Sequence, residues 1–562
     1  MTWSSARRIP LALAAIAAVF LAIALPGAGS RGVTSEEVQP YLTRYPFVLD
    51  LVEGRAQPMP PYEPGAPPRP RWVATPQWPV LAYDGEKRVW PVFIRGHQTA
   101  LGSYFGIALG PLLGGGVAGL QRSSVLLTLL LLPLAYLLAR RSWSFRRDGS
   151  PLALLAPGLL ALTFGTIFFG RTGYAFEIAS RVGMMAALVA AARLEPLTGR
   201  RALLAGLAAG IAVLCRATIA VTLAPALAIL LAHPARRAPW SRRAVVPLAM
   251  AALPLAVLGL FALLAPFREG TAPLADFPLH SVWKRAADVP GHLFVQLAWL
   301  GDAQSILGPV RSGAPPFRPL VVGALVGAIP VNFAVARWWR GVAGDGERML
   351  VAGLLGNAVG GAFIYGQPSE FQLAMALDPL LAVAVAEQVA AIAGARRAAG
   401  VAAIALAVRA QSVVFGLALD GRGTNPMFSG STQRGAVAML EELGVRGEEL
   451  VTTTYNQAGV IEAWTEGSIR PVHAWPVLRS GGPGDAPHLG TRFAAVLDAH
   501  RPRYVLLSEG ANPYEGSFTD NAAISAALFE IVARKGGRIE RQWAFPTESG
   551  APGWRLVSVV YP

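Results

Sequence analysis

The chain has 562 residues, of which 53% are hydrophobic and 15% are charged, and its formal net charge is +15. Soluble globular chains carry about 25% charged residues, so these proportions exclude an ordinary soluble protein. The hydrophobic residues form long blocks, as in membrane-spanning helices. The arginines lie in short clusters between these blocks. We therefore interpret the positive charge as a membrane-topology signal of the positive-inside kind and not as a nucleic-acid surface.

The first hydrophobic block covers residues 9–28 and follows Arg7 and Arg8. A block of about twenty residues is long enough to span a bilayer, so we predict an uncleaved first helix with a cytoplasmic N-terminus. A cleaved signal peptide is the alternative, because small residues at 26–30 could be accepted by a signal peptidase. The single cysteine, Cys215, excludes a disulfide framework and a cysteine-based metal site.

A polar, proline-rich stretch at 30–98 is predicted to form the first outer loop. Residues 101–118 are apolar and rich in glycine. We predict a helix lying at the outer interface there, because a full span would place the arginine cluster at 140–147 outside. Ten further spans follow, at 123–139, 151–169, 175–193, 202–214, 217–232, 244–266, 318–336, 349–365, 370–393 and 398–417.

The predicted fold is thus a polytopic α-helical membrane domain, 1–417, with about eleven transmembrane helices and a second large outer loop at 267–317. The C-terminus is expected outside the cell's inner membrane. Residues 418–562 instead predict a small extracytoplasmic α/β domain with a largely parallel sheet. Its predicted helices cover 432–444, 457–464, 490–500 and 521–535, and its strands 449–454, 469–473, 504–507, 537–543 and 554–560.

No nucleotide-binding fingerprint is recognisable in the sequence. The glycine-rich run at 481–485 lacks the strand–loop–helix setting and the Lys-Ser/Thr pair of a phosphate-binding loop. We therefore expect no nucleotide cofactor and no nucleic-acid partner.

Ionisable residues near the outer face are candidate functional groups, because charge is costly close to a bilayer. Glu36 and Glu37 follow the first helix closely. Two adjacent carboxylates can supply a general base or bind a hard divalent cation. The alternative is a solvated acidic pair that begins a short helix capped by Ser35.

Two other places carry candidate residues. Glu177 and Arg181 share one helix face at the turn before the fourth predicted span. One interpretation is a simple i,i+4 ion pair, and the other is a phosphate site that also includes Arg171. His97 lies in the loop before the interfacial segment, where a lone histidine is more often part of the polar surface than of a site.

Together these segments resemble the integral-membrane GT-C glycosyltransferases, in particular the protein mannosyltransferases and the lipid A aminoarabinose transferases. The resemblance covers about residues 8–390 in topology and only short stretches in sequence, and the family's Lys-Pro-Pro turn is absent. The positions that match the family's motifs are the acidic pair Glu36 and Glu37, the turn at His97 before Tyr104, Arg122 at the second span, and the outer acidic residue Glu177.

The resemblance implies a polyprenyl-phosphate sugar donor and transfer to an envelope lipid, glycan or protein at the outer face of the membrane. It implies one-step inverting transfer, in which Glu37 or Glu36 takes the proton of the acceptor or holds a divalent ion such as Mg²⁺ or Mn²⁺. Basic side chains would hold the lipid phosphate as it leaves. These are His97, Arg122, Arg171 and Arg181.

Three alternatives remain open. A lipid or sugar transporter or flippase would explain the helix break at Cys215–Arg216 and the charges that lie scattered inside spans. An O-antigen ligase or polymerase would use basic residues in the loop at 267–317. An inactive relative would act as a scaffold. The scattered charges are Arg216, Asp378, Glu387 and Arg409.

Overall fold

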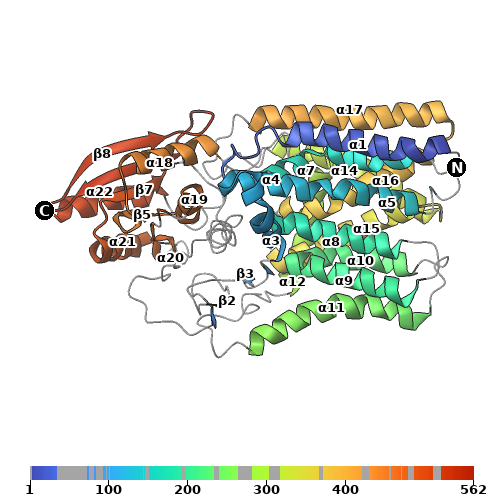
Figure 1. Ribbon diagram of the computed structural model, residues 1–562, viewed down its shortest axis with the longest axis horizontal. Helices are drawn as coiled ribbons and strands as arrows, with labels where there is room; N and C mark the ends of the chain where they lie inside the picture. The colour runs from blue at the N-terminus through green and yellow to red at the C-terminus, as the bar shows by residue number, and fades with distance from the viewer. Residues whose placement is uncertain are drawn as a thin grey trace.

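The computed structural model is an elongated bundle of helices with an α/β domain at one end (Figure 1). Glu36, Glu37 and His97, named as candidates above, lie outside the residues that the structure describes. The described residues are 3–33, 72–74, 81–83, 93–95, 98–99, 101–142, 145, 151–173, 175–192, 197–232, 239–263, 282–302, 317–365, 371–420, 429–454, 457–466, 468–469, 471–478, 486–509 and 521–562.

The bundle is built from long apolar helices that pack through alanine, leucine and aromatic side chains. Its largest buried side chains include Phe20, Phe164, Phe168, Phe176 and Trp299, each less than 2% exposed. The helices are α1 (Trp3–Ala24), α4 (Gly116–Leu129), α5 (Leu131–Arg141), α6 (Leu155–Ala161), α7 (Phe164–Thr172), α8 (Ala175–Ala191), α9 (Gly199–Cys215), α10 (Ala220–Ala232), α11 (Trp240–Leu263), α14 (Phe317–Trp339), α15 (Asp345–Tyr365), α16 (Asp378–Ala390) and α17 (Ala395–Asp420).

Every predicted span overlaps one or two of these helices, but the predicted count of eleven transmembrane helices is not confirmed. By length and composition, three helices among the described residues can cross a membrane: 116–141, 320–339 and 395–418. The pair α6–α7, bent by 53°, makes a fourth if it is one span. Leucine and isoleucine side chains on α11, α14 and α17 point outward, and Leu248, Ile329 and Ile404 are each 64–68% exposed. Such an apolar surface suits lipid, so the chain is a multi-pass membrane protein.

The predicted interfacial helix at 101–118 is shorter than expected. Helix α3 (Leu101–Leu109) and the single turn η1 (Pro111–Leu113) form its first part, and α4 begins at Gly116. The chain turns at Gly114, Gly115 and Gly116, whose φ angles are +111°, +67° and +50°. Only glycine adopts these angles without steric cost, so the glycine run separates α3 from the following span.

The predicted outer loop at 267–317 contains a helix, α12 (Val282–Leu300), that the sequence analysis did not predict. Gly301 at its end lies against Gly323 and Gly327 of α14, where a Cβ on Gly301 would come within 1.9 Å of the Gly323 carbonyl oxygen. Because α14 begins at residue 317, α12 ends about two to three turns along it. We infer that α12 enters the bundle from its outer end and stops within it.

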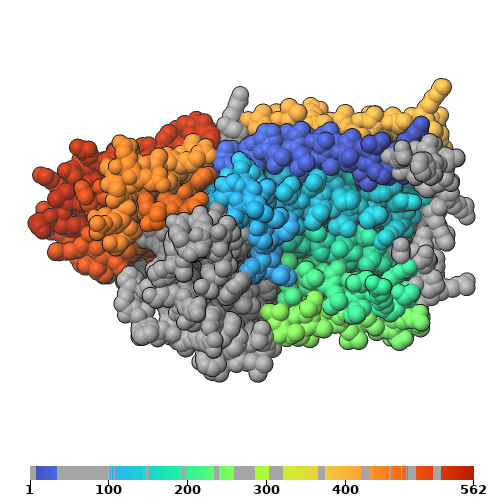
Figure 2. All heavy atoms as spheres, in the orientation of Figure 1, coloured from blue at the N-terminus to red at the C-terminus, as the bar shows by residue number. Residues whose placement is uncertain are grey.

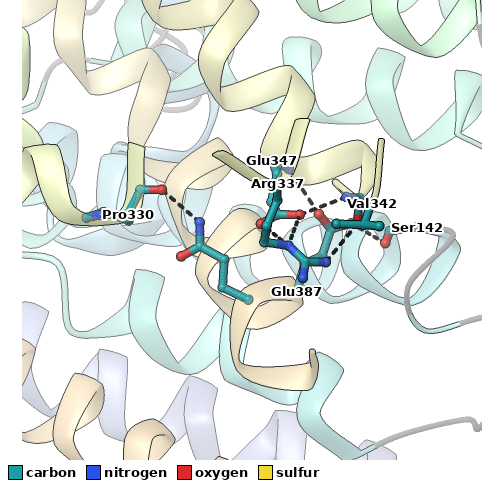
Figure 3. A network of polar contacts seen from close by, with 8 residues as sticks. Ser142, Pro330, Arg337, Val342, Glu347 and Glu387 are labelled. Carbon is teal, nitrogen blue, oxygen red and sulfur yellow. Dashed lines mark hydrogen bonds and ion pairs between the residues drawn. The ribbon is translucent and has the colours of Figure 1, made fainter. Parts of the chain in front are cut away.

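A polar cluster joins the helices at the other end of the bundle (Figure 3). Ser142, which follows α5, donates a hydrogen bond to the Glu387 carboxylate on α16. The same carboxylate accepts the Glu347 backbone N–H of α15 at 2.9 Å. Glu347 in turn forms an ion pair with Arg337 of α14 at 2.8 Å. We call Ser142, Arg337, Glu347 and Glu387 the inner cluster, and we use outer for the end of the bundle that carries the C-terminal domain (Figure 1).

The C-terminal domain has a five-stranded sheet in the order β6-β5-β7-β9-β8. Strands β6, β5 and β7 are parallel, while β9 is antiparallel to both β7 and β8. The sheet is therefore mixed, where a largely parallel one was predicted. Its elements are α18 (Gly430–Glu442), β5 (Leu450–Thr452), α19 (Gln457–Trp464), β6 (Val472–His473), α20 (Trp475–Leu478), α21 (Ala486–His500), β7 (Tyr504–Ser508), α22 (Asn521–Arg534), β8 (Arg538–Phe545) and β9 (Trp554–Val560).

The sheet has one apolar cluster on each face. Leu450, Tyr504 and Leu506 pack with α18 and α19 on one face. Val451 and Val505 pack with α21 and α22 on the other. This alternation along each strand is the period-2 pattern of a sheet buried on both sides.

The C-terminal domain docks on the outer end of the bundle through α18 and α19 (Figure 2). The Gln433 side chain accepts from the Val33 N–H and donates to the Val33 carbonyl, both at 2.9 Å. Arg434 donates to the carbonyl of Ser30. Apolar side chains of the bundle, Val117 among them, join the α18/α19 cluster. The turn that follows α1 is thus fixed between the two parts.

Two small antiparallel strand pairs lie between α1 and α3 in the sequence. Strand β1 (Trp72–Ala74) pairs with β2 (Leu81–Tyr83). Strand β3 (Phe93–Arg95) pairs with β4 (Gln98–Thr99).

Candidate functional site

Buried charges gather in the bundle towards the end that carries the C-terminal domain. Glu177 lies in the first turn of α8 and forms an ion pair with Arg216, and the two side chains are 3% and 4% exposed. Arg216 also donates from Nε to Thr218 Oγ1 at 2.8 Å. Its backbone is extended, with φ −155° and ψ 110°, and ends α9. The break at Cys215–Arg216 therefore places a cation against Glu177.

Arg181 follows one turn later on α8 and has no exposed surface. None of its three guanidinium nitrogens has a hydrogen-bond partner among the described residues. The i,i+4 ion pair with Glu177 considered above is therefore not formed, because Glu177 pairs with Arg216. The charges that act on Arg181 through space are those of Glu177, Asp378 and Arg216. Two carboxylates thus balance the two arginines in this interior.

Asp378 connects this group to α12. It begins α16 and accepts a hydrogen bond from Trp299 Nε1 at 2.7 Å, while its second carboxylate oxygen has no hydrogen-bond partner in the described part of the chain. Just beyond Trp299, Asp302 forms an ion pair with Arg409 of α17. Three of the charges that sequence analysis left scattered therefore lie near one another. We call Glu177, Arg181, Arg216 and Asp378 the outer network.

Three arginines lie in or around the turn at 25–33 that follows α1. Arg122 on α4 is exposed and donates to the Leu113 carbonyl at 2.7 Å. Arg171 at the end of α7 is 9% exposed and donates to the Pro26 carbonyl. The Arg31 guanidinium lies 4.0 Å from the centre of the Phe168 ring. We call Arg31, Arg122 and Arg171 the outer arginine group.

Glycines make room for these guanidinium groups. A Cβ on Gly27 would lie 1.9 Å from a terminal nitrogen of Arg171, and a Cβ on Gly114 would lie 2.5 Å from one of Arg122. Both glycines also have positive φ angles, +95° and +111°. The sequence therefore keeps two positions without side chains where arginines cross the backbone.

Of the predicted phosphate-binding residues, Arg122 and Arg171 belong to the outer arginine group and Arg181 belongs to the outer network. Arg122 alone among these three is exposed. Sequence reasoning named Arg216 and Asp378 without assigning them a role, and it missed Trp299. The available signal was an ionisable residue inside an apolar span, which tends to mark a functional interior.

Glu36 and Glu37, the residues predicted to bind a metal ion, lie outside the described residues. Within the described part of the chain, no group of three or more histidine, cysteine, aspartate or glutamate side chains could hold a metal ion.

No protein-family profile and no curated protein matches the sequence. Among solved structures, the chain is similar to ArnT from Cupriavidus metallidurans bound to undecaprenyl phosphate, with a TM-score of 0.53, 12% identity and 97% of each chain covered. It is also similar to ArnT in the apo state (TM-score 0.39, 11% identity, 99% and 98% covered). A third similar structure is a mutant of the mycobacterial arabinofuranosyltransferase AftD (TM-score 0.43, 13% identity, 97% of this chain and 41% of that one).

The first of these similarities extends over nearly the whole chain, C-terminal domain included. It shows that the protein has the GT-C glycosyltransferase fold, as the sequence resemblance predicted. At 12% identity it defines the fold alone.

Proposed function

We propose that this protein is a membrane glycosyltransferase that moves a sugar from a polyprenyl-phosphate donor to a lipid, glycan or protein acceptor at the outer face of the inner membrane. The observation that carries the proposal is the similarity of the whole fold to ArnT, whose structure holds undecaprenyl phosphate. The outer arginine group supports it, because guanidinium forks match phosphate oxygens. The missing nucleotide fingerprint fits a lipid-linked donor.

In the proposed reaction, the bond between the anomeric carbon and the phosphate oxygen breaks while a bond to the acceptor oxygen forms. The acceptor proton passes to Glu37 or Glu36, and the polyprenyl phosphate leaves with the bonding electrons. Stabilising that leaving charge is the largest electrostatic task at such a site. Val33, where the arginine-lined turn ends, precedes Glu36 by three residues in the sequence.

The basic residues have different parts in this proposal. Arg122 contacts the donor phosphate directly. The residue is exposed, and its hydrogen bond to the Leu113 carbonyl uses one guanidinium nitrogen, Nη1. His97 is proposed as a second direct contact. Arg171 and Arg181 act mainly through their charge, since they are 9% and 0% exposed. A buried charge acts over a longer range than an exposed one, because solvent screens it less.

The test is transfer by the full-length protein in lipid nanodiscs, given a panel of undecaprenyl-phosphate sugars and a cell-envelope extract as acceptor. Release of undecaprenyl phosphate is measured by mass spectrometry. Glu37→Gln is expected to lower the rate by about 100- to 10,000-fold, because glutamine cannot accept the proton. Glu530→Gln, at a carboxylate whose side chain is 70% exposed, is the matched control.

The proposal fails if no donor sugar in the panel is consumed. The catalytic assignment alone fails if Glu36→Gln, Glu37→Gln and the double variant keep full activity. Chelation of divalent ions decides between the two roles of the pair, since a metal-holding pair predicts loss of activity and a general base predicts none.

Reporter fusions test the orientation: those after 345 and 397 should be cytoplasmic and one after 430 should be outside.

A further inference from the structure

The carboxyl ends of the parallel strands in the C-terminal domain carry polar groups with no partner among the described residues. Thr454 follows β5, and Ser508 ends β7. The hydroxyl oxygens of both are buried without a hydrogen-bond partner in the described part of the chain. The residues are 0% and 2% exposed. An unpaired buried hydroxyl costs about 1–3 kcal/mol, so two at one edge are a significant cost to the free protein.

Strand pairing places these two residues at the same edge of the sheet. Thr452 at the end of β5 pairs with Leu506 of β7, and Thr453 Oγ1 donates to the Leu506 carbonyl at 3.0 Å. Thr454 and Ser508 each follow these paired residues by two positions, so both lie at this end of the two strands. Residues two apart on a strand share a face, so Ser508 lies on the face of Leu506, which packs with α18 and α19.

Two more polar atoms lie at this edge. Gln457 begins α19 and is fully buried; its Oε1 accepts from the backbone N–H groups of Thr453 and Thr454 at 3.0 and 3.2 Å, while its Nε2 has no partner among the described residues. His473 ends β6 opposite Thr452 and is hydrogen bonded to the Thr454 backbone, while its Nε2 is buried and likewise unpaired there. The edge thus offers hydrogen-bonding atoms from β5, β6, β7 and α19.

The edge lies at the crossover point of the sheet. β5 has β6 on one side and β7 on the other, so the connections after β5 and β6 lead in opposite directions. In open α/β sheets, ligands bind outside the carboxyl ends of the strands at such a point.

This edge lies towards the membrane bundle. Glu509, next to Ser508, donates its backbone N–H to the Gly553 carbonyl at 2.8 Å. A Cβ on Gly553 would in turn lie 2.8 Å from Thr432 Oγ1 at the start of α18. The same first turns of α18 hold Ser30 through Arg434. The edge is therefore linked by short contacts to the turn that the outer arginine group surrounds.

The chemistry of these atoms selects an uncharged ligand. Burial lowers the pKa of His473 to about 4, so its ring is neutral at pH 7 and Nε2 accepts hydrogen bonds. The carboxylate at the edge, Glu509, is paired with Arg555. Hydroxyls that donate or accept, an amide that donates and an imidazole that accepts match the hydroxyl groups of a sugar, which do both.

We propose that the carboxyl edge of β5, β6 and β7, formed by Thr454, Gln457, His473 and Ser508, binds the uncharged saccharide portion of the acceptor. The role of this saccharide as acceptor rests on the proposed function, whereas saccharide binding itself does not. The site would present the acceptor from the C-terminal domain to the outer end of the bundle.

The test is binding of the full-length protein in nanodiscs to a glycan array that carries neutral and phosphorylated forms of the same oligosaccharides. Neutral glycans should be retained, and Thr454→Val and Ser508→Ala should each weaken binding about 10-fold, the effect of one hydrogen bond. Ser558→Ala is the matched control, because this hydroxyl belongs to the same sheet and has its own partner, Glu540, at 3.3 Å. It should leave binding unchanged.

Thermal unfolding gives an independent measurement. Valine replaces the unpaired Thr454 hydroxyl with a methyl group, so Thr454→Val should unfold at the same or a higher temperature while binding is weakened. A lower unfolding temperature with unchanged binding would mean that the hydroxyl serves only the fold, and would overturn the proposal. Preference for phosphorylated glycans, competition by inorganic phosphate, or no glycan binding at all would overturn it too. Retention of neutral glycans without any sugar transfer would refute the glycosyltransferase and leave the saccharide site standing.

Discussion

The bundle has two groups of buried charges, one at each end, and they are satisfied to different degrees. In the inner cluster, Ser142, Arg337, Glu347 and Glu387 each have a hydrogen bond or ion pair within the group. In the outer network, Glu177 and Arg216 are paired, but Arg181 has no hydrogen bond to any described residue. The inner cluster joins helix ends through direct contacts. In the outer network, the charge of Arg181 is balanced only through space, by nearby carboxylates.

The difference indicates where function lies. Buried polar groups are nearly always hydrogen bonded, and exceptions in native proteins concentrate at functional sites. Among the exceptions in the described residues are Arg181 and one oxygen of Asp378 in the outer network, and Thr454 and Ser508 at the facing edge of the C-terminal domain; single unpaired atoms also occur elsewhere, such as Nε of Arg348 beside the inner cluster. Both sets lie towards the boundary between the bundle and the domain, where the proposed transfer would occur.

The largest expected effect is that of breaking the ion pair in the outer network. Glu177→Ala leaves Arg216 buried beside Arg181 without this carboxylate, which should cost about 3–5 kcal/mol of folding free energy. Replacing both partners, as Glu177→Ala with Arg216→Met, should recover most of that loss. Chemical denaturation of the detergent-solubilised protein measures both variants. Equal stability of the single variant and the parent would show that the pair is not formed in solution.

A smaller loss is expected from the inner cluster. Glu387→Ala removes the acceptor of the Ser142 hydroxyl and of the Glu347 N–H, so stability should fall by about 2–4 kcal/mol. Transfer activity per folded molecule should stay unchanged, because this cluster is at the opposite end of the bundle from the proposed site. A lower transfer activity per folded molecule would show that the inner cluster also contributes to transfer, and the contrast between the two groups would be lost.

The C-terminal domain should lose stability in acid through His473. The folded pKa is about 4 and the unfolded pKa about 6.5, so the unfolded chain binds the proton first. The contribution is complete above pH 6.5 and is lost as the pH falls towards 4. One pKa unit corresponds to about 1.4 kcal/mol, and partial exposure reduces the full shift, so we expect a loss of about 2 kcal/mol. His473→Asn should flatten this part of the pH dependence of unfolding.

Most elements of the C-terminal domain could be predicted from sequence, although predicted strand 469–473 is observed only at Val472–His473 and α20 was not predicted. Predicted helix 457–464 and strand 554–560 match α19 and β9 residue for residue. Apolar and polar residues alternate in such a domain with the period of the secondary structure, so the pattern itself carries the boundaries. The antiparallel direction of β9 could not be predicted, because the sequence of a strand does not indicate which strand it pairs with or in which direction.

The candidate site was less predictable, for a physical reason. Glu177 was matched with Arg181, its neighbour on the helix, although its partner is Arg216, 39 residues away. The i,i+4 rule predicts only contacts within one helix, whereas the buried Glu177 pairs with a residue at the end of another helix. Helix α12 was missed because the buried polar residues Arg285, His292 and Gln296 on it look like loop residues when their burial is unknown.

The smallest expected effect on stability is the most informative. Arg181→Met removes a fully buried guanidinium that makes no hydrogen bond to the described residues, so no bonded partner is left behind among them. The lost attraction of Glu177 and Asp378 is offset by the removed cost of burying a cation, and we expect a change within about 1 kcal/mol. If the charge of Arg181 helps to hold the leaving phosphate, transfer should nevertheless fall about 10-fold or more, and the KM for the lipid donor should rise.

Arg409→Met is the matched control: it breaks the ion pair with Asp302 and a 3.0 Å hydrogen bond to Leu300, so it should destabilise the fold strongly. A large loss of stability in Arg181→Met with an unchanged rate per folded molecule would assign Arg181 to the structure of the bundle, and the outer network would then differ from the inner cluster only in geometry.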